Sequence, residues 1–575
     1  MRTELLKTMK KKWHIRNDNF EKASSEEQIV NNILLNRKLY TEKEKTAFLF
    51  PDYERDLNNP FLMNDMEKAV NRVILAKKQG DRICIYGDYD ADGVTATVLV
   101  KDFFDQIGIN SFCYIPDKDK EGNSLNKKAI DYIESHGAKL IITVDCGISS
   151  FQEVVYAKKK KIETIITDHH SLPKKMPEAL AIINPKASPD YPEKNLAGVG
   201  VAFKFISALA DSLDEYDNAQ LKWFLDLVAI GTIADCVPLI GENRTLVKFG
   251  LLVLSKTKRV GLKQIFQVGA LNINSGLIPS AEQISFQLAP RINAAGRIDH
   301  ANLAFNLLST PTDREDLARD LAWELEKKNQ YRQKITEKII HEVEDKLKIK
   351  KKLPAVIMEW SPRWNYGIVG LVAGKIAEKY HRPTIILQEK DEILRGSGRS
   401  VPGINFIEIL REFDYLINRY GGHSQALGGE FPKKNIAELK NNLERKIAPL
   451  LKTKTSQKLN IDAELSLEQV TFDLANEISR MEPFGEGNPE PVFLIKNLKV
   501  SDLKLVGNGE KHLKLTLSGQ NSNSCLSAIG FRLADTYANL KVNDKIDLVF
   551  ALQKNQWNGI ESLQAKIIDL DIISS

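Results

Sequence analysis

The feature that most limits the fold of this chain is an alternation of short apolar strands with helical stretches between about Asp81 and Asp235. Stretches with helical spacing, such as VTATVLVKDFFDQIG, separate the strand segments RICIYGD, SFCYIPD, LIITVD and TIITD. Strands and helices that alternate in this way form βαβ units, and such units build a parallel sheet. We therefore predict a parallel α/β domain in this part of the chain.

The length of the chain requires several domains. It has 575 residues, whereas a single hydrophobic core stops growing at roughly 250–300 residues. The composition, 43% hydrophobic and 27% charged, is typical of a globular protein. A formal net charge of +5 permits binding to nucleic acid without requiring it, because a basic groove is a local property.

Changes of pattern along the chain predict a multidomain α/β protein with a C-terminal barrel. Charged helical spacing predicts a long connecting helix, and a new strand–helix–strand pattern follows it, with glycine-rich turns at GSGRSVPG and GGHSQALGG. From about residue 459, short strands separated by turn residues predict a small β-barrel like an OB-fold. The predicted parts are an N-terminal extension that packs on the parallel α/β domain (1–50), that domain (51–312), the connecting helix (313–352), a smaller α/β domain (353–455) and the barrel (456–575).

Apolar runs and cysteines restrict the compartment. No apolar run approaches the roughly 18 residues of a membrane-spanning helix, and the first residues, MRTELLKTMKKKWHI, lack the apolar stretch of a secretory signal. Five scattered cysteines without a CxxC pair suggest neither a disulfide framework nor a thiolate zinc site. We expect a cytoplasmic protein that is not bound to a membrane.

Acidic and histidine side chains follow the predicted strands where those strands end. The carboxyl ends of parallel strands meet at one edge of a sheet, which is where open α/β sheets bind their ligands. Each residue alone has a structural explanation as a turn former, a helix cap or a hydrogen-bonded surface residue. The set lies in YGDYDADG, TVDCG, TDHH and GTIAD and consists of Asp88, Asp90, Asp92, Asp145, Asp168, His169, His170 and Asp235.

The residue types in this set predict a metal site. Three carboxylates in one turn repel one another unless a cation lies among them. Carboxylates and imidazoles without thiolates favour manganese or magnesium over structural zinc, and a shared carboxylate holds two ions about 3.5–4 Å apart. Two such ions activate water and neutralise charge on phosphorus, so no covalent nucleophile is needed. The sequence therefore predicts a two-metal phosphoesterase that uses Mn2+ or Mg2+.

The segments YGDYDADG, TVDCG, TDHH and GTIAD resemble, in order and spacing, the four motifs of the DHH phosphoesterase superfamily. Further segments are similar to its RecJ-type family of single-stranded-DNA exonucleases, over nearly the whole chain from about Asp81: LAGVGVAFK, PLIGENR, LAPRINAAGRI, GSGRSVPGINF, GGHSQALGG and MEPFGEGNPEPVF. The resemblance implies a DHH domain, a DHHA1 domain and an OB-fold round a positively charged groove.

The same resemblance implies roles for individual residues. It implies that Asp145 is the carboxylate that bridges the two metals, and it is less certain about a metal-binding role for Asp88. It allows His170 to be a metal ligand or a phosphate contact, with Asp168 as the group that orients it. The implied metal ligands are Asp88, Asp90, Asp92, Asp145, His169, His170 and Asp235, of which all but Asp88 are expected to be catalytic. The implied contacts to DNA or to a 5′ phosphate are Lys118, Arg291, Arg297, Ser397, Arg399 and His423.

The chain departs from the family pattern at two places. After IP, the family segment carries an arginine and ends in EGYG, whereas this chain has IPDKDKEGNS, with Lys118 and with Asn123-Ser124 at its end. A lysine keeps the charge but loses the guanidinium fork. Asn365 stands where the family has a histidine. In the barrel, Lys511, His512, Lys514 and Trp557 are candidates for strand contacts, although core packing explains Trp557 equally well.

Three functions fit the sequence. The first is an exonuclease that degrades single-stranded DNA 5′→3′ to 5′-mononucleotides, in DNA repair and recombination by resemblance. The second is an oligonucleotidase or nucleotide phosphatase, which the barrel disfavours, and the third is a non-catalytic DNA-binding scaffold, which the intact acidic set disfavours. For the first function we expect a monomer that acts on single-stranded DNA, with a single-strand-binding protein and a helicase as partners.

Overall fold

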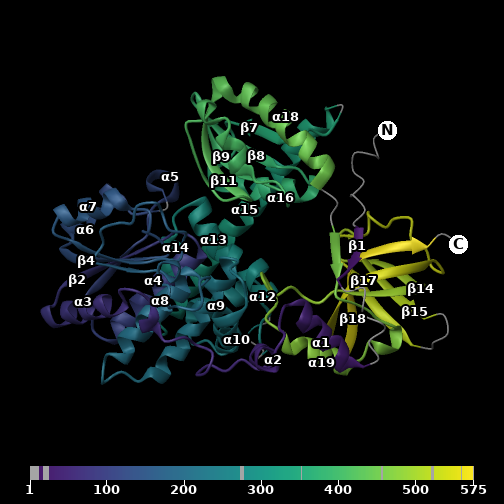
Figure 1. Ribbon diagram of the computed structural model, residues 1–575, viewed down its shortest axis with the longest axis horizontal. Helices are drawn as coiled ribbons and strands as arrows, with labels where there is room; N and C mark the ends of the chain where they lie inside the picture. Colours follow the sequence, from purple (N-terminus) through teal and green to yellow (C-terminus); the bar gives the residue numbers. More distant parts are fainter. Residues whose placement is uncertain are drawn as a thin grey trace. The chain divides into compact units, whose positions relative to one another are not determined.

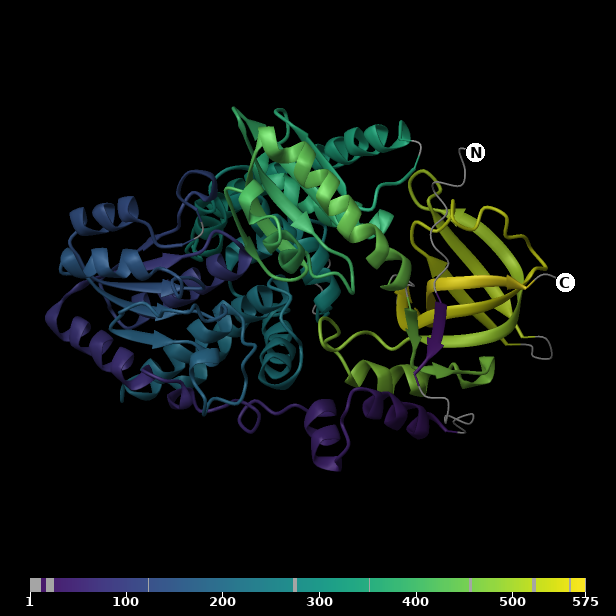
Figure 2. The same cartoon turned by 45° about the horizontal axis from the view of Figure 1, so that its top comes forward.

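The computed structural model divides into two compact units (Figures 1 and 2). The first unit comprises Met1–Asp52, Ser456–Phe484 and Asn488–Ser575, and the second comprises Tyr53–Thr455 and Gly485–Gly487. None of the described helices combines the length and apolar character that spanning a bilayer requires. The structure describes residues 12–16, 25–122, 124–271, 273, 277–350, 352–454, 458–519, 524–557 and 560–573.

A five-stranded parallel sheet forms the centre of the first α/β domain in the second unit, with strand order β3-β2-β4-β5-β6. The predicted parallel sheet is therefore confirmed. Nearly every residue of its central strands is buried, as expected where helices cover both faces of a sheet. The strands are β2 (Arg82–Gly87), β3 (Ser111–Tyr114), β4 (Ala138–Val144), β5 (Glu163–Thr167) and β6 (Ala181–Ile183).

Two separate cores lie on the two faces of this sheet. Side chains of β2 alternate between them, because successive residues of a strand point to opposite faces. Ile83 and Ile85 enter a core with α3, α4, α8 and α9, whereas Cys84 and Tyr86 enter a core with α6 and α7. The bounds are α3 (Met66–Gln79), α4 (Ala91–Gln106), α6 (Lys127–Ser135), α7 (Phe151–Lys159), α8 (Gly198–Asp211), α9 (Leu225–Ala234), α10 (Gly241–Leu254), α11 (Val260–Val268), α13 (Ala289–Ile298) and α14 (Asn302–Leu308).

The predicted connecting helix is α15, which runs from Glu315 to Lys348. Its first half buries residues such as Leu325 in the core of the first α/β domain. Its second half buries Val343 in a core that it shares with α16 (Tyr366–Tyr380) of the next domain. One helix thus belongs to the cores of both α/β domains.

The second α/β domain contains a mixed five-stranded sheet with the order β10-β11-β9-β8-β7. Strands β7 and β8 are parallel, and the other neighbours are antiparallel. The helix α18 (Ile436–Lys454) follows this sheet. The strands are β7 (Ile357–Ser361), β8 (Thr384–Lys390), β9 (Ile393–Arg399), β10 (Arg419–Gly422) and β11 (Ala426–Pro432).

The prediction that GSGRSVPG and GGHSQALGG are turns is wrong for most of their glycines. Gly396 lies within β9 and pairs with Gly429 of β11. A Cβ on Gly396 would lie 2.1 Å from the carbonyl oxygen of Ile386 on β8, so glycine is needed for close strand approach. The turns are confined to short pieces such as residues 423–425, between β10 and β11.

A closed five-stranded barrel forms most of the first unit, which confirms the predicted OB-like fold. It closes because β14 pairs with both β15 and β17, while β16 pairs with β18. The side chain of Trp557, a candidate for stacking, lies outside the described residues. The strands are β14 (Phe493–Val506), β15 (His512–Ser518), β16 (Cys525–Gly530), β17 (Lys545–Trp557) and β18 (Ile560–Ile573).

The described part of the N-terminal extension belongs to the barrel unit, whereas the sequence analysis placed it on the first α/β domain. Strand β1 (Lys12–Ile15) pairs in parallel with β12 (Lys458–Ile461). Helix α1 (Glu26–Asn36) buries its apolar stripe in the core that also contains the apolar face of α19 (Phe472–Arg480). The expectation fails because a stripe of this kind predicts that a helix packs without specifying its partner.

Candidate metal and phosphate site

The loop between β2 and α4 holds the first two carboxylates through backbone N–H groups. Asp90 is the N-cap of α4, and its Oδ1 accepts hydrogen bonds from the N–H groups of Asp92 and Gly93 at 3.0 and 3.1 Å. Asp88 accepts one from the N–H of Tyr89 at 2.7 Å. These bonds hold both carboxylates at the carboxyl end of β2.

Asp92 and Asp145 meet at the N-terminus of α8. The two oxygens of Asp92 accept the N–H groups of Gly198 and Val199 at 2.7 and 2.8 Å. A Cβ at position 198 would lie 2.4 Å from Oδ1 of Asp145, so only glycine lets the start of α8 come this close to both carboxylates. The positive end of the helix dipole faces them, which stabilises their negative charge.

Asp145 follows β4 with a strained backbone. Its φ of 61° lies in the left-handed region, which is uncommon for residues other than glycine. Its N–H donates to the carbonyl of Thr167 at the end of β5, and its side chain is 97% buried. Strain of this kind persists where surrounding structure holds a functional side chain in place.

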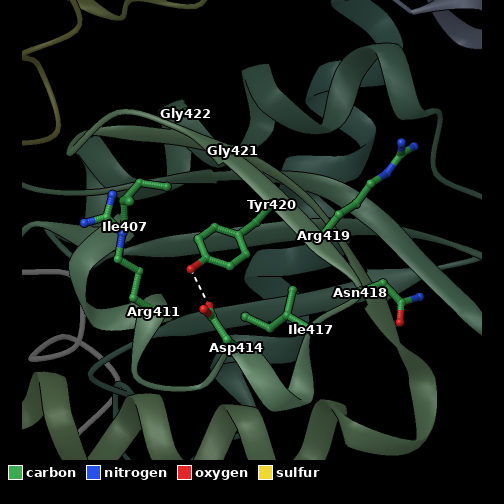
Figure 3. Close-up of a pocket in the computed structure, with 9 residues that line it drawn as sticks. All are labelled: Ile407, Arg411, Asp414, Ile417, Asn418, Arg419, Tyr420, Gly421 and Gly422. Atoms are coloured by element: carbon green, nitrogen blue, oxygen red, sulfur yellow. Dashed lines mark hydrogen bonds between the residues drawn. The ribbon is translucent and has the colours of Figure 1, made fainter. Parts of the chain in front are cut away.

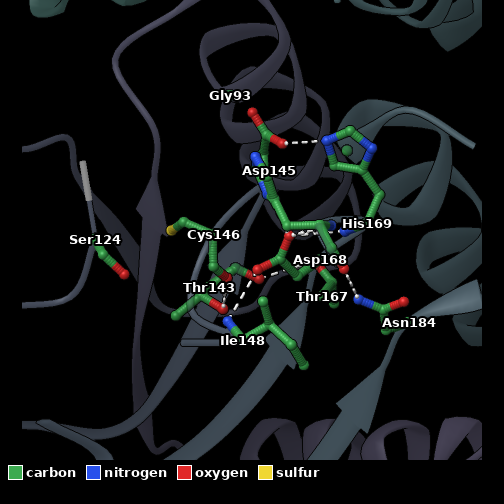
Figure 4. A network of polar contacts seen from close by, with 12 residues as sticks. Gly93, Ser124, Thr143, Asp145, Cys146, Ile148, Thr167, Asp168, His169 and Asn184 are labelled. Atoms are coloured by element: carbon green, nitrogen blue, oxygen red, sulfur yellow. Dashed lines mark hydrogen bonds and ion pairs between the residues drawn. The ribbon is translucent and has the colours of Figure 1, made fainter. Parts of the chain in front are cut away.

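Asp168 orients its neighbours (Figure 4). Its Oδ1 accepts the Nδ1–H of His170 at 2.7 Å and the backbone N–H of His169, and its Oδ2 accepts the N–H of Ile148 at 2.9 Å. Burial alone would raise the pKa of Asp168, but the hydrogen bond and charge of His170 lower it below its ordinary value. The same bond raises the pKa of His170 to about 9.

His169 points into the acidic cluster. Its Nε2 lies 3.3 Å from Oδ1 of Asp145 and 3.6 Å from Oδ2 of Asp235. Burial, together with the charge of His170, lowers the pKa of His169 to about 4, so its imidazole is neutral and able to donate a lone pair. Nε2 of His169 and Oδ1 of Asp145 are both buried, and neither has a hydrogen-bond partner among the described residues.

The carboxylates destabilise one another's charge. Burial and repulsion by Asp90 raise the pKa of Asp92 to about 7, and burial and repulsion by Asp92 raise that of Asp235 to about 8. Burial and neighbouring carboxylates also raise the pKa values of Asp88 and Asp145 well above the ordinary range. A divalent cation would remove this repulsion and would satisfy the two unpartnered atoms.

The structure brings together all seven predicted ligands. Within each of three groups, one potential ligand atom per residue lies within 4.8 Å of the others. The donor set of oxygens and imidazole nitrogens suits Mn2+ or Mg2+. The groups are Asp88, Asp90 and Asp145; Asp92, His169 and Asp235; and Asp145, His169 and His170.

Lys186, which no sequence motif singled out, lies beside this cluster. Its Nζ donates to the carbonyl oxygen of His169. Burial lowers its pKa, whereas the charges of Asp168 and Asp235 oppose that shift. Lys186 follows β6 in the segment INPKAS, so the rule that directed attention to the ends of the other parallel strands could have found it.

Ser397 and Arg399 lie together on β9, facing α16. Nη1 of Arg399 donates to Oγ of Ser397 at 2.8 Å, and a Cβ on Gly370 of α16 would lie 3.4 Å from that oxygen. Burial and the charge of Arg297 lower the pKa of Arg399. The hydrogen bonds described for these two arginines go to carbonyl and hydroxyl oxygens, and two guanidinium groups that repel each other form a site suited to an anion.

A third arginine, Arg332 of α15, was missed by the sequence analysis. Burial lowers its pKa, and so do the charges of Arg297 and Arg291. Its Nη2 donates to Asn329 at 2.8 Å, while its buried Nε has no hydrogen-bond partner among the described residues. In the sequence it lies in the middle of a charged helix, where an arginine usually faces solvent.

Three other predicted strand contacts lie in different surroundings. Arg291 forms an ion pair with Glu326 at 2.7 Å, so part of its charge is already neutralised. Nζ of Lys118 lies 4.7 Å from the centre of the Tyr89 ring, close to the first carboxylates. His423 is exposed in the turn between β10 and β11, where its N–H donates to the carbonyl of Ala426.

The structure accounts for one departure from the family pattern. Asn365 is the N-cap of α16, and its Oδ1 accepts the N–H of Gly367 at 2.8 Å. A Cβ on Gly367 would lie 2.2 Å from the carbonyl oxygen of Arg297, so this helix start packs closely against α13. Asn123 lies outside the described residues.

A separate pocket of about 560 Å³ lies in the second α/β domain (Figure 3). Tyr420 on β10 donates a hydrogen bond to Asp414 across it, and Arg411 and Arg419 contribute positive charge. None of the clustered carboxylates or histidines lines this pocket. It is therefore not part of the metal centre.

Comparison with protein families matches three domain models to this chain. The DHH family N-terminal domain matches residues 82–232, the DHHA1 domain matches residues 352–449, and the RecJ OB domain matches residues 461–569. The first span contains the acidic cluster except Asp235, which follows it by three residues, and the other two contain the strand with Ser397 and Arg399 and the barrel.

Two curated relatives and two crystal structures are similar over most of the chain. The single-stranded-DNA-specific exonuclease RecJ of Bacillus subtilis is 35% identical over 97% of this chain and 71% of the relative, and that of Escherichia coli is 33% identical over 88% and 90%. RecJ of Thermus thermophilus in complex with Mn2+ is 28% identical with a TM-score of 0.79, covering 95% of this chain and 76% of that one. Its complex with Mg2+ is 27% identical with a TM-score of 0.73, covering 95% and 75%.

Proposed function

The chain belongs to the RecJ family of single-stranded-DNA-specific exonucleases, and on this premise we propose that it is a metal-dependent exonuclease that degrades single-stranded DNA. The observation that carries the proposal is a pair of buried atoms, Oδ1 of Asp145 and Nε2 of His169, that have no hydrogen-bond partner among the described residues and lie inside a cluster of carboxylates with raised pKa values. A cluster built in this way is stable when it holds cations.

We assign Mn2+ or Mg2+ to this cluster as the cofactor. Asp145 belongs to two of the three ligand groups, which supports a bridging role for it. When bound, two such ions supply an activated water and neutralise charge on the phosphodiester. The ligands that we propose are Asp88, Asp90, Asp92, Asp145, His169, His170 and Asp235.

The residues of the chain perform the remaining tasks. Asp168 holds the ring of His170 and thereby orients it toward the cluster, and Lys186 adds a positive charge beside it. Removal of an orienting partner of this kind costs about 10- to 100-fold in metal affinity or activity. The backbone N–H groups at the start of α8 fix Asp92 before substrate arrives.

We propose that Ser397 and Arg399 bind a 5′ phosphate and so give 5′→3′ polarity, and that the products are 5′-mononucleotides. A guanidinium fork matches the geometry of phosphate oxygens, and Arg399 has no carboxylate partner among its described hydrogen bonds. The other strand contacts that we propose are Lys118, Arg291, Arg297 and His423. The predicted domain boundaries at residues 50, 312, 352 and 455 also stay proposals.

A single assay tests this function. Purified protein receives 5′-labelled single strands, 3′-labelled single strands and duplex, each with Mn2+, Mg2+ or a chelator. With Mn2+ or Mg2+, we expect the 5′-labelled strand to release labelled mononucleotide from the first turnover. We expect no release in chelator and little digestion of duplex. Activity in chelator, or digestion from the 3′ end, would contradict the proposal.

Partners and compartment belong to the same proposal. We propose a monomeric cytoplasmic enzyme of DNA repair and recombination, which receives its single strands from a helicase and a single-strand-binding protein. Light scattering of the purified chain tests the monomer. Co-purification with these two classes of protein tests the partners.

A further inference from the structure

The exposed face of α15 carries aromatic rings interleaved with lysines. Trp323 and Tyr331 are 51% and 55% exposed, which is unusual for side chains of this size. Lys327 and Lys334 are also exposed. At about 100° per residue, these four side chains fall within an arc of about 80° on the helix.

This face is separate from the metal centre. The opposite side of α15 buries Leu325 and Asn329 and packs against α13, to which Glu326 is joined by its ion pair with Arg291. Helical geometry therefore directs Trp323 and Lys327 away from α13. The contact between α13 and the segment with the first carboxylates is a different one, in which Asn293 accepts the N–H of Ala91. In Figure 1, α15 lies beside the α13 and α16 labels, at the junction of the two α/β domains.

The sequence of α15 gives no folding reason for these rings. A helix that packs on one side normally presents polar side chains to solvent, and the stripe that contains Leu325 and Val343 already supplies its apolar contacts. Of the carboxylates near this arc, Asp316 and Asp320 precede Trp323, and the exposed Glu324 and Glu337 lie outside the arc on either side. The part of the face from Trp323 onward is therefore mainly aromatic and basic.

We propose that this face binds single-stranded DNA outside the metal centre. The bases of a single strand stack on exposed aromatic rings, and its phosphates attract lysines between them. Trp323 and Tyr331 are about 12 Å apart along the helix axis, a distance that a few nucleotides span. Duplex DNA keeps its base faces stacked internally, so it does not use the rings. The choice of DNA rests on the proposed function.

A third exposed ring lies on a segment that Arg291 links to α15. Phe286 is 75% exposed in a π-helical turn, Ile284–Leu288, a type of turn that is frequent at functional sites. Its neighbour Gln287 accepts a hydrogen bond from Arg291, which also contacts Glu326 of α15. Arg291 therefore links the segment that carries Phe286 to α15.

The test compares binding with cleavage in the variant Trp323→Ala/Tyr331→Ala. In chelator, we expect binding of a single strand of about 30 nucleotides to weaken about tenfold or more. Cleavage of a substrate of about 5 nucleotides stays unchanged, because so short a strand needs only the metal centre. Since binding is measured in chelator, an inactive wild type would contradict the proposed function and would leave this comparison intact.

Three further variants make the result specific. Trp323→Phe/Tyr331→Phe should restore most of the binding, because the rings remain. Lys327→Gln/Lys334→Gln should lower the slope of log affinity against log salt by about 1.4. The control Tyr415→Ala removes another ring, 70% exposed on the second α/β domain, and should bind like wild type. The proposal would be overturned if the double alanine variant bound the strand with wild-type affinity. It would also be overturned if Tyr415→Ala lost as much affinity, or if the double phenylalanine variant recovered none.

Discussion

The two sheets of the second unit carry sites of opposite charge, and the two sites are built differently. The parallel sheet gathers buried carboxylates that backbone N–H groups hold from several sides, as for Asp92 at the start of α8. The mixed sheet carries Ser397 and Arg399 on one strand, where the charge of Arg297 on α13 acts on Arg399, and the charge of Arg297 also acts on Arg332 of α15. Helix α13 contacts both sites. It carries Arg297, and its Asn293 accepts the N–H of Ala91, which follows Asp90 at the start of α4.

This difference teaches how each charge is held. Carboxylates that bind metal need fixed positions, so small displacements should lower the rate of the chemical step. A cationic site that binds a phosphate contributes mainly affinity, so its loss should appear in KM. Substitutions in the two sites should therefore differ in which kinetic constant they change.

The largest effect should follow Asp145→Ala. Asp145 belongs to two ligand groups, so we expect mononucleotide release with Mn2+ to fall by at least about a thousandfold. Single-strand affinity in chelator should stay close to wild type. The control is Asp105→Ala, an exposed carboxylate at the far end of α4. A rate near that of wild type for Asp145→Ala would refute the metal-site assignment.

A smaller loss should follow Gly198→Ala. The new Cβ would lie 2.4 Å from Oδ1 of Asp145, so Asp145 or the start of α8 must move, and we expect the rate constant kcat to fall about 100-fold. Gly200→Ala is the matched control, because its Cβ would meet Leu196 at an ordinary 3.5 Å. Equal activities of the two variants would show that the geometry at α8 does not limit the reaction.

Arg399→Lys should act on KM and leave kcat nearly unchanged. Lysine keeps the charge but loses the fork, so we expect KM for a 5′-phosphorylated strand to rise about tenfold. A strand with a 5′ hydroxyl should show little change, which makes it the internal control. A fall in kcat with an unchanged KM would contradict the division of labour between the two sheets.

The smallest effect should follow Asn365→Ala. This change removes the N-cap of α16 and should lower the free energy of unfolding by about 1 kcal/mol, measured with denaturant. Asn365→Asp keeps an acceptor and serves as the control. We expect the exonuclease rate to be unaffected at low temperature. A large loss of activity without a loss of stability would give Asn365 a direct role in the reaction.

Much of the acidic site could be predicted because its residues lie next to strand ends in short segments. Any parallel sheet brings such ends together, so the sequence predicts that Asp90, Asp145 and His169 meet. The glycines of β9 and β11 were misjudged, because glycine marks both turns and close strand approach. The partner of the N-terminal helix was misplaced, because an apolar stripe does not name what covers it.

The sequence by itself determined the parallel sheet, the metal-binding character of the acidic cluster and the closing barrel, since all three follow from local periodicity and residue type. The tertiary structure alone decided that Arg332 feels the charge of Arg297, that Lys186 feels the charge of Asp235, and that Gly198 admits two carboxylates. These contacts join residues far apart in the chain. Their distances depend on how helices pack, which no local pattern encodes.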